Sequence, residues 1–234
     1  MSVFIGVDGG GTSTRAVVVD REGHELGRAV AGGAVATSHD PSAAARAVSR
    51  AVRDAAEVAG VQLPAAVLWA GLAGAGPKEA REGVTKAILR LRLADQVHVG
   101  TDVEAAFHDA FPQGPGMLLI AGTGSIAWVA SAEKGDVAAL APVVVAAADA
   151  GDAGAEAVVA RAVDALVAHV RASAALLGGE RPAVVLWGGL VADQGPLRTR
   201  VANALEHAGW GIDERRLDPV RGAAYLALES RPPG

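Results

Sequence analysis

Apolar residues follow two different spacings along the chain, and together these spacings predict a mixed α/β protein. Short apolar runs of strand length alternate with longer stretches in which Ala and Val recur at helical spacing. In the first half we expect strands over 3–7, 15–19, 24–30, 65–69 and 97–99, and helices over 41–59, 77–91 and 103–111. In the second half we expect strands over 117–120, 126–129 and 183–187, and helices over 137–150, 153–177, 196–208 and 220–228.

The order of these elements predicts two lobes. The first half runs strand, strand, strand, helix, strand, helix, strand, helix, which is the order of a ribonuclease H-like lobe. At residue 117 a strand, a glycine turn and a returning strand begin again, as they do at the N-terminus. We therefore divide the chain into an N-terminal lobe over 1–112 and a C-terminal lobe over 113–234, both ribonuclease H-like.

The composition narrows the classes of protein that fit. Hydrophobic residues make up 51% of the chain and aromatic residues 3%, so small and branched side chains must fill the cores, which favours α/β architecture. The net charge of -5, without any block of like charges, gives no basic face for nucleic acid. No signal-peptide pattern opens the chain and no apolar stretch has the length of a membrane helix, so we expect a cytoplasmic protein without a membrane partner.

Cysteine and histidine offer little chemistry. The chain has no cysteine, which excludes disulfides, thiolate nucleophiles, iron–sulfur clusters and cysteine zinc sites. Its six histidines include no pair at i, i+4, which argues against a histidine metal cage. The candidate chemistry lies instead in glycine turns and carboxylates.

A run of three glycines after the first strand has the pattern of a phosphate-binding hairpin turn. It lacks the Gly-Lys-Ser/Thr of a Walker loop, and it leads into the β-branched run 14–19 rather than into the helix of a dinucleotide fold. Glycine N–H groups can approach a phosphate closely, and Asp8 at the strand end can hold Mg²⁺ through water. The residues of this turn are Gly9, Gly10, Gly11, Thr12 and Ser13. A branched side chain at Gly10 would crowd the phosphates and resist a positive φ, although an ordinary glycine hairpin remains the alternative.

Two further glycine turns lie in the second half of the chain. The first consists of Gly122, Thr123, Gly124 and Ser125. Its spacing imitates a dinucleotide fingerprint, but a predicted strand rather than a helix follows it. The second, Gly188 and Gly189, ends a strand before a helix, where a flat adenine can lie against the backbone. A structural hairpin and a simple strand-to-helix turn remain the alternatives.

Asp102 is the candidate catalytic residue. It follows a predicted strand closely, where a carboxylate can project into a cleft. It fits equally well as the N-cap of the helix predicted from Val103. A carboxylate fixed on backbone donors would be a poor base, so the two interpretations predict different chemistry.

Taken together, these motifs resemble the N-acetylglucosamine kinase and BadF/BadG/BcrA/BcrD ATPase family. The resemblance rests on Asp8-Gly9-Gly10-Gly11-Thr12, Thr101-Asp102, Gly122-Thr123-Gly124-Ser125 and Gly188-Gly189, in this order. It extends from Phe4 nearly to the end, with Ala70–Gly74, Ala138–Pro142 and Val220–Ala224 as further similar stretches.

The resemblance implies the actin-like ATPase fold, in which two ribonuclease H-like lobes close on ATP. It implies that Asp102 takes the proton from a sugar hydroxyl, that Asp8 organises Mg²⁺, and that the glycine turns hold the phosphates and adenosine. Such positioning and charge neutralisation supply most of the rate in phosphoryl transfer. Since the lack of cysteine argues against the iron–sulfur dehydratase activators of the family, we expect an ATP-dependent kinase of an amino sugar such as N-acetylglucosamine or glucosamine.

Two side chains that the family pattern leads us to expect are different here. Ser13 stands where relatives commonly carry Lys, so the turn has fewer cations unless Arg15, on the same strand face, compensates. No Asn lies within 33–37 to help hold the sugar, and Thr37 or Ser38 would have to substitute.

The third departure is in length. After Val129 relatives have several dozen residues that border the sugar cleft, whereas here residues 130–135 lead directly into a predicted helix. Either the chain lacks that subdomain, or a mobile segment has been omitted from the sequence. A non-catalytic nucleotide-binding protein therefore stays open as a second hypothesis, and a dinucleotide-dependent oxidoreductase as a third. A homodimer is compatible with each of them.

Overall fold

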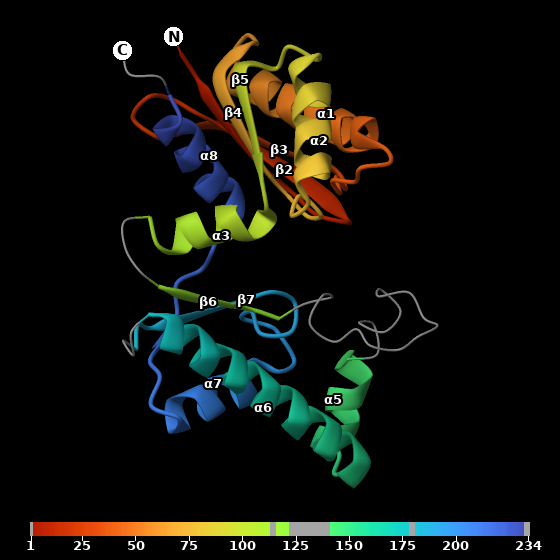
Figure 1. Ribbon diagram of the computed structural model, residues 1–234, viewed down its shortest axis with the longest axis vertical. Coiled ribbons are helices and arrows are strands. Elements are labelled where there is room, and N and C mark those ends of the chain that lie inside the picture. The colour runs from red at the N-terminus through yellow and green to blue at the C-terminus, as the bar shows by residue number, and fades with distance from the viewer. Residues whose placement is uncertain (1, 113–115, 122–140, 178–180, 232–234) are drawn as a thin grey trace. The chain divides into compact units, whose positions relative to one another are not determined.

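The computed structural model of the chain describes residues 2–112, 116–121, 141–177 and 181–231 (Figure 1). Contacts within the chain divide it into two compact units. The first comprises Met1–Pro112 and Leu217–Gly234, and the second comprises Gln113–Arg216. None of the described helices combines the length and the apolar character needed to cross a membrane.

The first unit is built on a five-stranded sheet with the order β3-β2-β1-β4-β5. Its strands are β1 (Phe4–Gly9), β2 (Ser13–Val19), β3 (Glu25–Gly32), β4 (Ala65–Leu72) and β5 (Ala94–Gly100). The first three strands pair antiparallel as a meander, and β1, β4 and β5 pair parallel. The strands predicted over 3–7, 15–19 and 24–30 are therefore confirmed, and they form this meander.

Helices cover both faces of this sheet (Figure 1). Two of them, α1 (Pro41–Ala59) and α2 (Lys78–Leu89), lie on one face, and α3 (Asp102–Ala110) and α8 (Pro219–Glu229) lie on the other. Local sequence defines α1 well, because the Asp40 side chain caps its first turn and Gly60 ends it with a left-handed φ of 65°. Its buried Ala and Val side chains fill the core on that face.

The last helix belongs to the first unit, which corrects the division of the chain at 113–234. The apolar face of α8 packs on β1 and α3, where Val220, Ala223, Ala224 and Ala227 are fully buried. Two glycines allow this close approach, since a Cβ on Gly6 would overlap the α8 backbone and a Cβ on Gly222 would overlap the carbonyl of Ala105. Local pattern predicts the helix but carries no information on which sheet it covers.

The second unit holds a parallel sheet with the order β6-β7-β8. Its elements are β6 (Met117–Ile120), α5 (Ala141–Asp149), α6 (Ala153–Leu176), β7 (Val184–Trp187), α7 (Arg198–His207) and β8 (Ile212–Asp213). The short strand β8 was not predicted, because two residues are too few to show an apolar period. The predicted strand 126–129 and the stretch 130–135 lie outside the described residues.

The tight contact between β1 and α8 gives a stability prediction. We expect Gly6→Ala to lower the free energy of unfolding by about 1–3 kcal/mol or more, because its Cβ would meet backbone atoms that cannot move aside. Gly32→Ala is the matched control, since a Cβ on Gly32 would meet no described atom within 4 Å. Denaturant unfolding of both variants measures the difference, and equal stabilities would contradict the packing of α8 on β1.

Candidate nucleotide and catalytic site

The strand register places two carboxylates at one edge of the first sheet. In adjacent parallel strands Asp8 pairs with Gly71, and Gly71 pairs with Gly100. Asp102 comes two residues after Gly100, so it follows the end of β5 just as Asp8 lies near the end of β1. This is the edge at which parallel α/β sheets bind their ligands.

The surroundings of the Asp8 carboxylate suit it to bind a cation. Its side chain is 15% exposed and lies 4.0 Å from the guanidinium of Arg15, which is half exposed. Burial raises the pKa of Asp8 to about 6, an effect that Arg15 opposes. The negative charges of Asp102 and Asp218 contribute to this raised pKa, although less than burial does. Carboxylates that repel one another in this way suit a divalent cation, which would favour their ionised forms.

The first glycine turn leaves open space where a phosphate would lie. Gly10 closes the turn by donating its N–H to the Ser13 carbonyl at 2.9 Å. A Cβ on Gly10 would come no closer than 3.9 Å to a described atom, and a Cβ on Gly11 would meet none within 4 Å. Gly9 is different, because its Cβ would lie 2.6 Å from Leu72 Cδ2. Gly9 is thus needed for close packing against Leu72, while Gly10 and Gly11 leave space for a phosphate.

Two expectations about this turn need refinement. No residue from Gly9 to Gly11 has a left-handed φ, so the expected positive φ at Gly10 is wrong, and only the argument from space remains. The hairpin closes through one backbone hydrogen bond and needs no left-handed residue. Thr12 is exposed and Ser13 half-buried at the start of β2, and their contact with phosphate stays a prediction.

The segment expected to contact the sugar runs beside the glycine turn. Ala36 donates its N–H to the Ala73 carbonyl at 2.8 Å, and Ala73 donates to the Gly9 carbonyl at 2.8 Å. Thr37 uses its hydroxyl locally, accepting the N–H of Asp40 at 3.2 Å where α1 begins. Ser38 is exposed. Thr37 and Ser38 are the two residues proposed to replace the missing Asn. Because the Thr37 hydroxyl accepts a hydrogen bond in this turn, Ser38 is the better candidate to contact the sugar.

Asp102 is the first residue of α3 and not its cap. The N-cap is Thr101, whose Oγ1 accepts the N–H of Glu104 at 3.1 Å. Among the described residues, Asp102 Oδ1 accepts the adjacent Val103 N–H at 3.1 Å. The interpretation of Asp102 as the N-cap is therefore wrong, because Thr101 already fills that position. The carboxylate is left with the partial exposure that a base needs.

Sequence reasoning missed a buried carboxylate that fixes the start of α8. Asp109, whose side chain is 1% exposed, accepts the Asp218 N–H at 2.6 Å and pairs with Arg221 Nε at 2.9 Å. Asp218 in turn pairs with Arg28 at 2.8 Å. The Asp-Pro sequence before α8 signals a helix start, but no local pattern shows that Asp218 lies near enough to Asp8 to affect its pKa.

In the second unit, Gly188 and Gly189 have different roles. Gly188 has a φ of 105°, and a Cβ there would lie 2.5 Å from the Ala121 carbonyl oxygen, so this glycine serves packing. Gly189 has no described atom within 4 Å of its Cβ position and leaves room for a flat ligand. Ala121 directly precedes the predicted turn Gly122, Thr123, Gly124 and Ser125, which lies outside the described residues.

The family of the chain follows from comparison with known proteins. Residues 5–135 match the BadF/BadG/BcrA/BcrD ATPase family. The chain belongs to this family. The resemblance drawn from the glycine turns and Asp102 is thereby confirmed.

Relatives of this ATPase-family member include sugar kinases. It is 33% identical over 128 residues to a glucosamine kinase of Vibrio cholerae, a match that covers 53% of the chain but 42% of that enzyme. A candidate N-acetylglucosamine kinase structure from Chromobacterium violaceum aligns over 97% of this chain and 99% of the other, with 19% identity and a TM-score of 0.74. A glucokinase from Streptomyces griseus with bound glucose and AMPPNP aligns over 98% and 100%, with 19% identity and a TM-score of 0.56. These likenesses confirm the actin-like ATPase fold.

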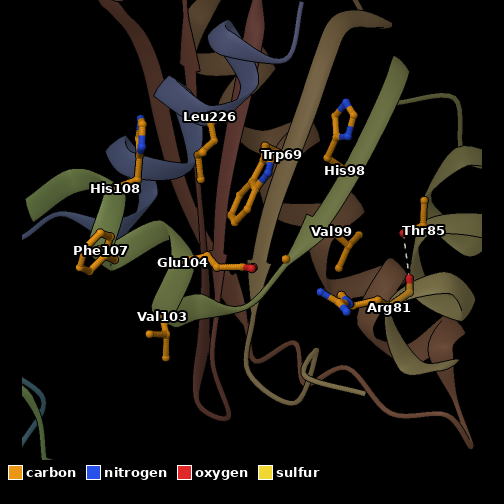
Figure 2. A pocket seen from close by; sticks show the side chains of 11 residues that line it. Trp69, Arg81, Thr85, His98, Val99, Val103, Glu104, Phe107, His108 and Leu226 are labelled. Atoms are coloured by element: carbon orange, nitrogen blue, oxygen red, sulfur yellow. Dashed lines mark hydrogen bonds between the residues drawn. The ribbon is translucent and has the colours of Figure 1, made fainter. Parts of the chain in front are cut away.

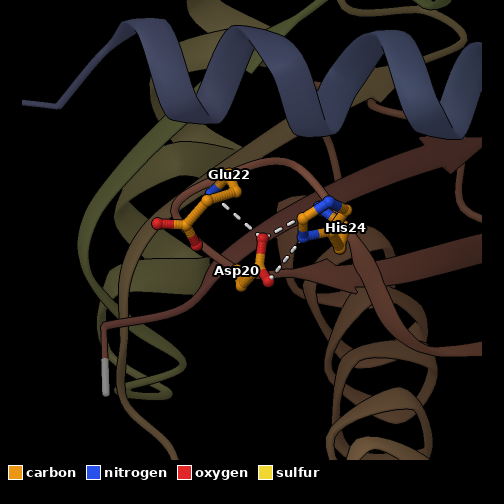
Figure 3. A group of neighbouring side chains, drawn as sticks. All are labelled: Asp20, Glu22 and His24. Atoms are coloured by element: carbon orange, nitrogen blue, oxygen red, sulfur yellow. Dashed lines mark hydrogen bonds and ion pairs between the residues drawn. The ribbon is translucent and has the colours of Figure 1, made fainter.

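A second group of potential metal ligands lies elsewhere in this family member. Among the described residues, Asp20, Glu22 and His24 bring ligand atoms within 4.8 Å of one another (Figure 3). Asp20 accepts the N–H groups of Glu22 at 3.0 Å and His24 at 2.8 Å, and also contacts the His24 ring at 3.1 Å. These contacts close the turn from β2 to β3, at the far end of β2 from the glycine turn. The group therefore has a structural role in the turn.

The open space at Gly10 gives a binding prediction. We expect Gly10→Val to weaken ATP binding by about tenfold or more while stability changes little, because the branched side chain would occupy the phosphate position and its Cβ would come no closer than 3.9 Å to a described protein atom. Gly211→Val is the control, since Gly211 also has open space but lies before β8. Calorimetric titration with ATP measures both variants, and unchanged affinity in folded Gly10→Val would remove this turn from the nucleotide site.

Proposed function

We propose that this chain is an ATP-dependent kinase of an amino sugar, with N-acetylglucosamine or glucosamine as the substrate. The proposal rests on the register of three adjacent parallel strands, in which Asp8 of β1 pairs with Gly71 of β4 and Gly71 pairs with Gly100 of β5. Since Asp102 follows Gly100 by two residues, Asp8 and Asp102 lie at the same edge of the sheet, beside an open glycine turn. The similarity to the Vibrio cholerae glucosamine kinase supports the choice of an amino sugar.

In the proposed reaction each acidic residue has a separate task. Asp102 accepts the proton of the sugar hydroxyl, whose oxygen attacks the γ-phosphorus of ATP as the bond to the β-phosphate oxygen breaks. Asp8 would hold Mg²⁺, which when bound would supply positive charge against the phosphates. The raised pKa of Asp8 fits this role, because a nearby cation would restore its ionised form.

Gly10, Gly11, Thr12 and Ser13 cradle the phosphates in this proposal. In the second unit, the predicted nucleotide-binding residues stay Gly189 and the turn of Gly122, Thr123, Gly124 and Ser125. Arg15 supplies the positive charge that Lys supplies in relatives, since its guanidinium already lies beside Asp8. The turn thus keeps a cation within reach of the phosphates despite Ser13.

A specific observation favours the second candidate function, a non-catalytic nucleotide-binding protein. The segment 33–37 holds no Asn, and the Thr37 hydroxyl is used in the turn before α1, so the expected sugar contacts are few. Such a protein would bind ATP but show no dependence on sugar.

A coupled assay of ADP release separates the two functions. Purified protein is incubated with ATP and Mg²⁺ and with each of glucosamine, N-acetylglucosamine, galactosamine, mannosamine and glucose. We expect ADP release that requires an amino sugar and is abolished by EDTA. ATP binding by calorimetry without sugar-dependent ADP release for any sugar would favour the non-catalytic function.

A further inference from the structure

We propose that Glu104 is a positioning residue that holds Asp102 in its reactive orientation. The inference rests on the proposed function, in which Asp102 is the general base. It concerns a contact that lies beside the base and does not involve the nucleotide.

Glu104 and Thr101 close the first turn of α3 on each other. The Glu104 carboxylate accepts the Thr101 N–H at 2.6 Å, and the Thr101 hydroxyl accepts the Glu104 N–H at 3.1 Å. This reciprocal pair is a capping box, which satisfies two backbone donors that the helix itself cannot satisfy. Asp102 lies between Thr101 and Glu104 in the chain, so the capping box restrains the backbone of Asp102 directly.

On the side of the sheet, the Trp69 ring lies next to the capping box. The Trp69 ring lies over two glycines at the ends of β4 and β5, with Cζ3 at 3.1 Å from the Cβ position of Gly71 and Cζ2 at 2.5 Å from that of Gly100. The Gly100 Cβ position would also overlap Glu104 Oε2. Figure 2 shows the Trp69 ring and the Glu104 carboxylate close together beside β5. The carboxylate therefore lies beside both the Trp69 ring and the end of β5.

The Glu104 side chain also faces an open groove. The groove has a volume of about 710 Å³, and Trp69, His98, Val103 and Phe107 line it as well. Val103 in the first turn of α3 is 47% exposed, and Phe107 one turn later is 38% exposed, so this face of the helix is open to solvent. On that side of the turn, the hydrogen bond from the Thr101 N–H to the Glu104 carboxylate ties the side chain to the start of the helix. Without it the Thr101 N–H loses its acceptor, and the turn carrying Asp102 can fray.

Small displacements of a base reduce the rate strongly, because proton transfer needs hydrogen-bond geometry with the substrate. We expect Glu104→Ala to lower kcat by about tenfold or more, with the KM for ATP within about twofold. Glu104→Gln should stay within about threefold of the wild type, because Gln also closes a capping box. The control is Asp152→Ala, which removes the cap of α6, where Asp152 accepts the Ala155 N–H at 2.8 Å. It should leave kcat unchanged.

A double-mutant cycle distinguishes positioning from a general structural effect. If Glu104 acts through Asp102, Glu104→Ala should reduce kcat no further in an Asp102→Asn background. An equal additional loss in that background would overturn the proposal, and so would wild-type kcat in Glu104→Ala.

Failure of the proposed function gives a different result. If no sugar supports ADP release by the wild type, the kinase assignment fails, and crystal structures of Glu104→Ala and Glu104→Gln then test the positioning role. We expect the Asp102 carboxylate to shift or become disordered in the Ala variant and to keep its place in the Gln variant. An unmoved Asp102 in Glu104→Ala would overturn the role of Glu104.

Discussion

Asp102→Asn should lower kcat for sugar phosphorylation by at least about 100-fold and change ATP affinity only a few-fold. An amide has nearly the shape of the carboxylate but cannot take a proton from the sugar hydroxyl, and loss of a general base commonly costs this much. The fold should be unaffected, because the amide oxygen can still accept the Val103 N–H that Asp102 Oδ1 accepts at 3.1 Å. Steady-state ADP release gives kcat, and calorimetry gives the affinity.

The matched control for this change is Asp95→Asn. Asp95 is exposed on β5, the strand that leads to Asp102, and its charge has no part in the proposed reaction. It should keep wild-type kcat. If Asp102→Asn also turned over at the wild-type rate, Asp102 would have no role as the base.

Asp8→Asn should stabilise the metal-free protein at neutral pH while abolishing Mg²⁺-dependent ATP binding. The pKa of Asp8 rises from 3.8 to about 6 on folding, chiefly through burial, so the folded state holds the proton more tightly than the unfolded state. Wild-type stability is therefore undiminished below pH 4, falls as the pH rises towards 6, and stays reduced above it. A shift of this size corresponds to about 3 kcal/mol at most.

The stability difference between Asp8→Asn and the wild type should accordingly be small near pH 4 and reach about 2–3 kcal/mol above pH 7. Denaturant unfolding in EDTA at a series of pH values measures it. Adding Mg²⁺ should raise wild-type stability at neutral pH and leave Asp8→Asn unchanged. A variant less stable than the wild type at pH 7.5 would show that the Asp8 charge is not held unfavourably in this site.

Sequence reasoning succeeded where local patterns determine structure. The helix α1 was predicted at its observed bounds, because Ala and Val recur at helical spacing and a glycine follows the last turn at Gly60. The hairpin of β1 and β2 follows likewise from two apolar runs around a glycine turn. By contrast, the attachment of α8 to the first unit depends on backbone contacts at Gly6 and Gly222, which are distant in sequence.

The candidate site shows the same limit. The motifs identified Asp8, Asp102 and the glycine turn, and the strand register brings the two carboxylates to one edge. The motifs could not show that Thr101 would cap α3 in place of Asp102, since both residues are good N-caps. Nor could they show the buried Asp109, whose partners Asp218 and Arg221 lie more than 100 positions away.

Product analysis decides whether the chain transfers a phosphoryl group from ATP to an amino sugar. Phosphorus-31 NMR of a reaction with ATP, Mg²⁺ and the sugar that supports the fastest ADP release distinguishes a sugar phosphate from inorganic phosphate. We predict a sugar phosphate formed in equal amount to ADP by the wild type, and its loss in Asp102→Asn. ADP accompanied only by inorganic phosphate, or no ADP with any amino sugar, would show that the chain is not an amino-sugar kinase.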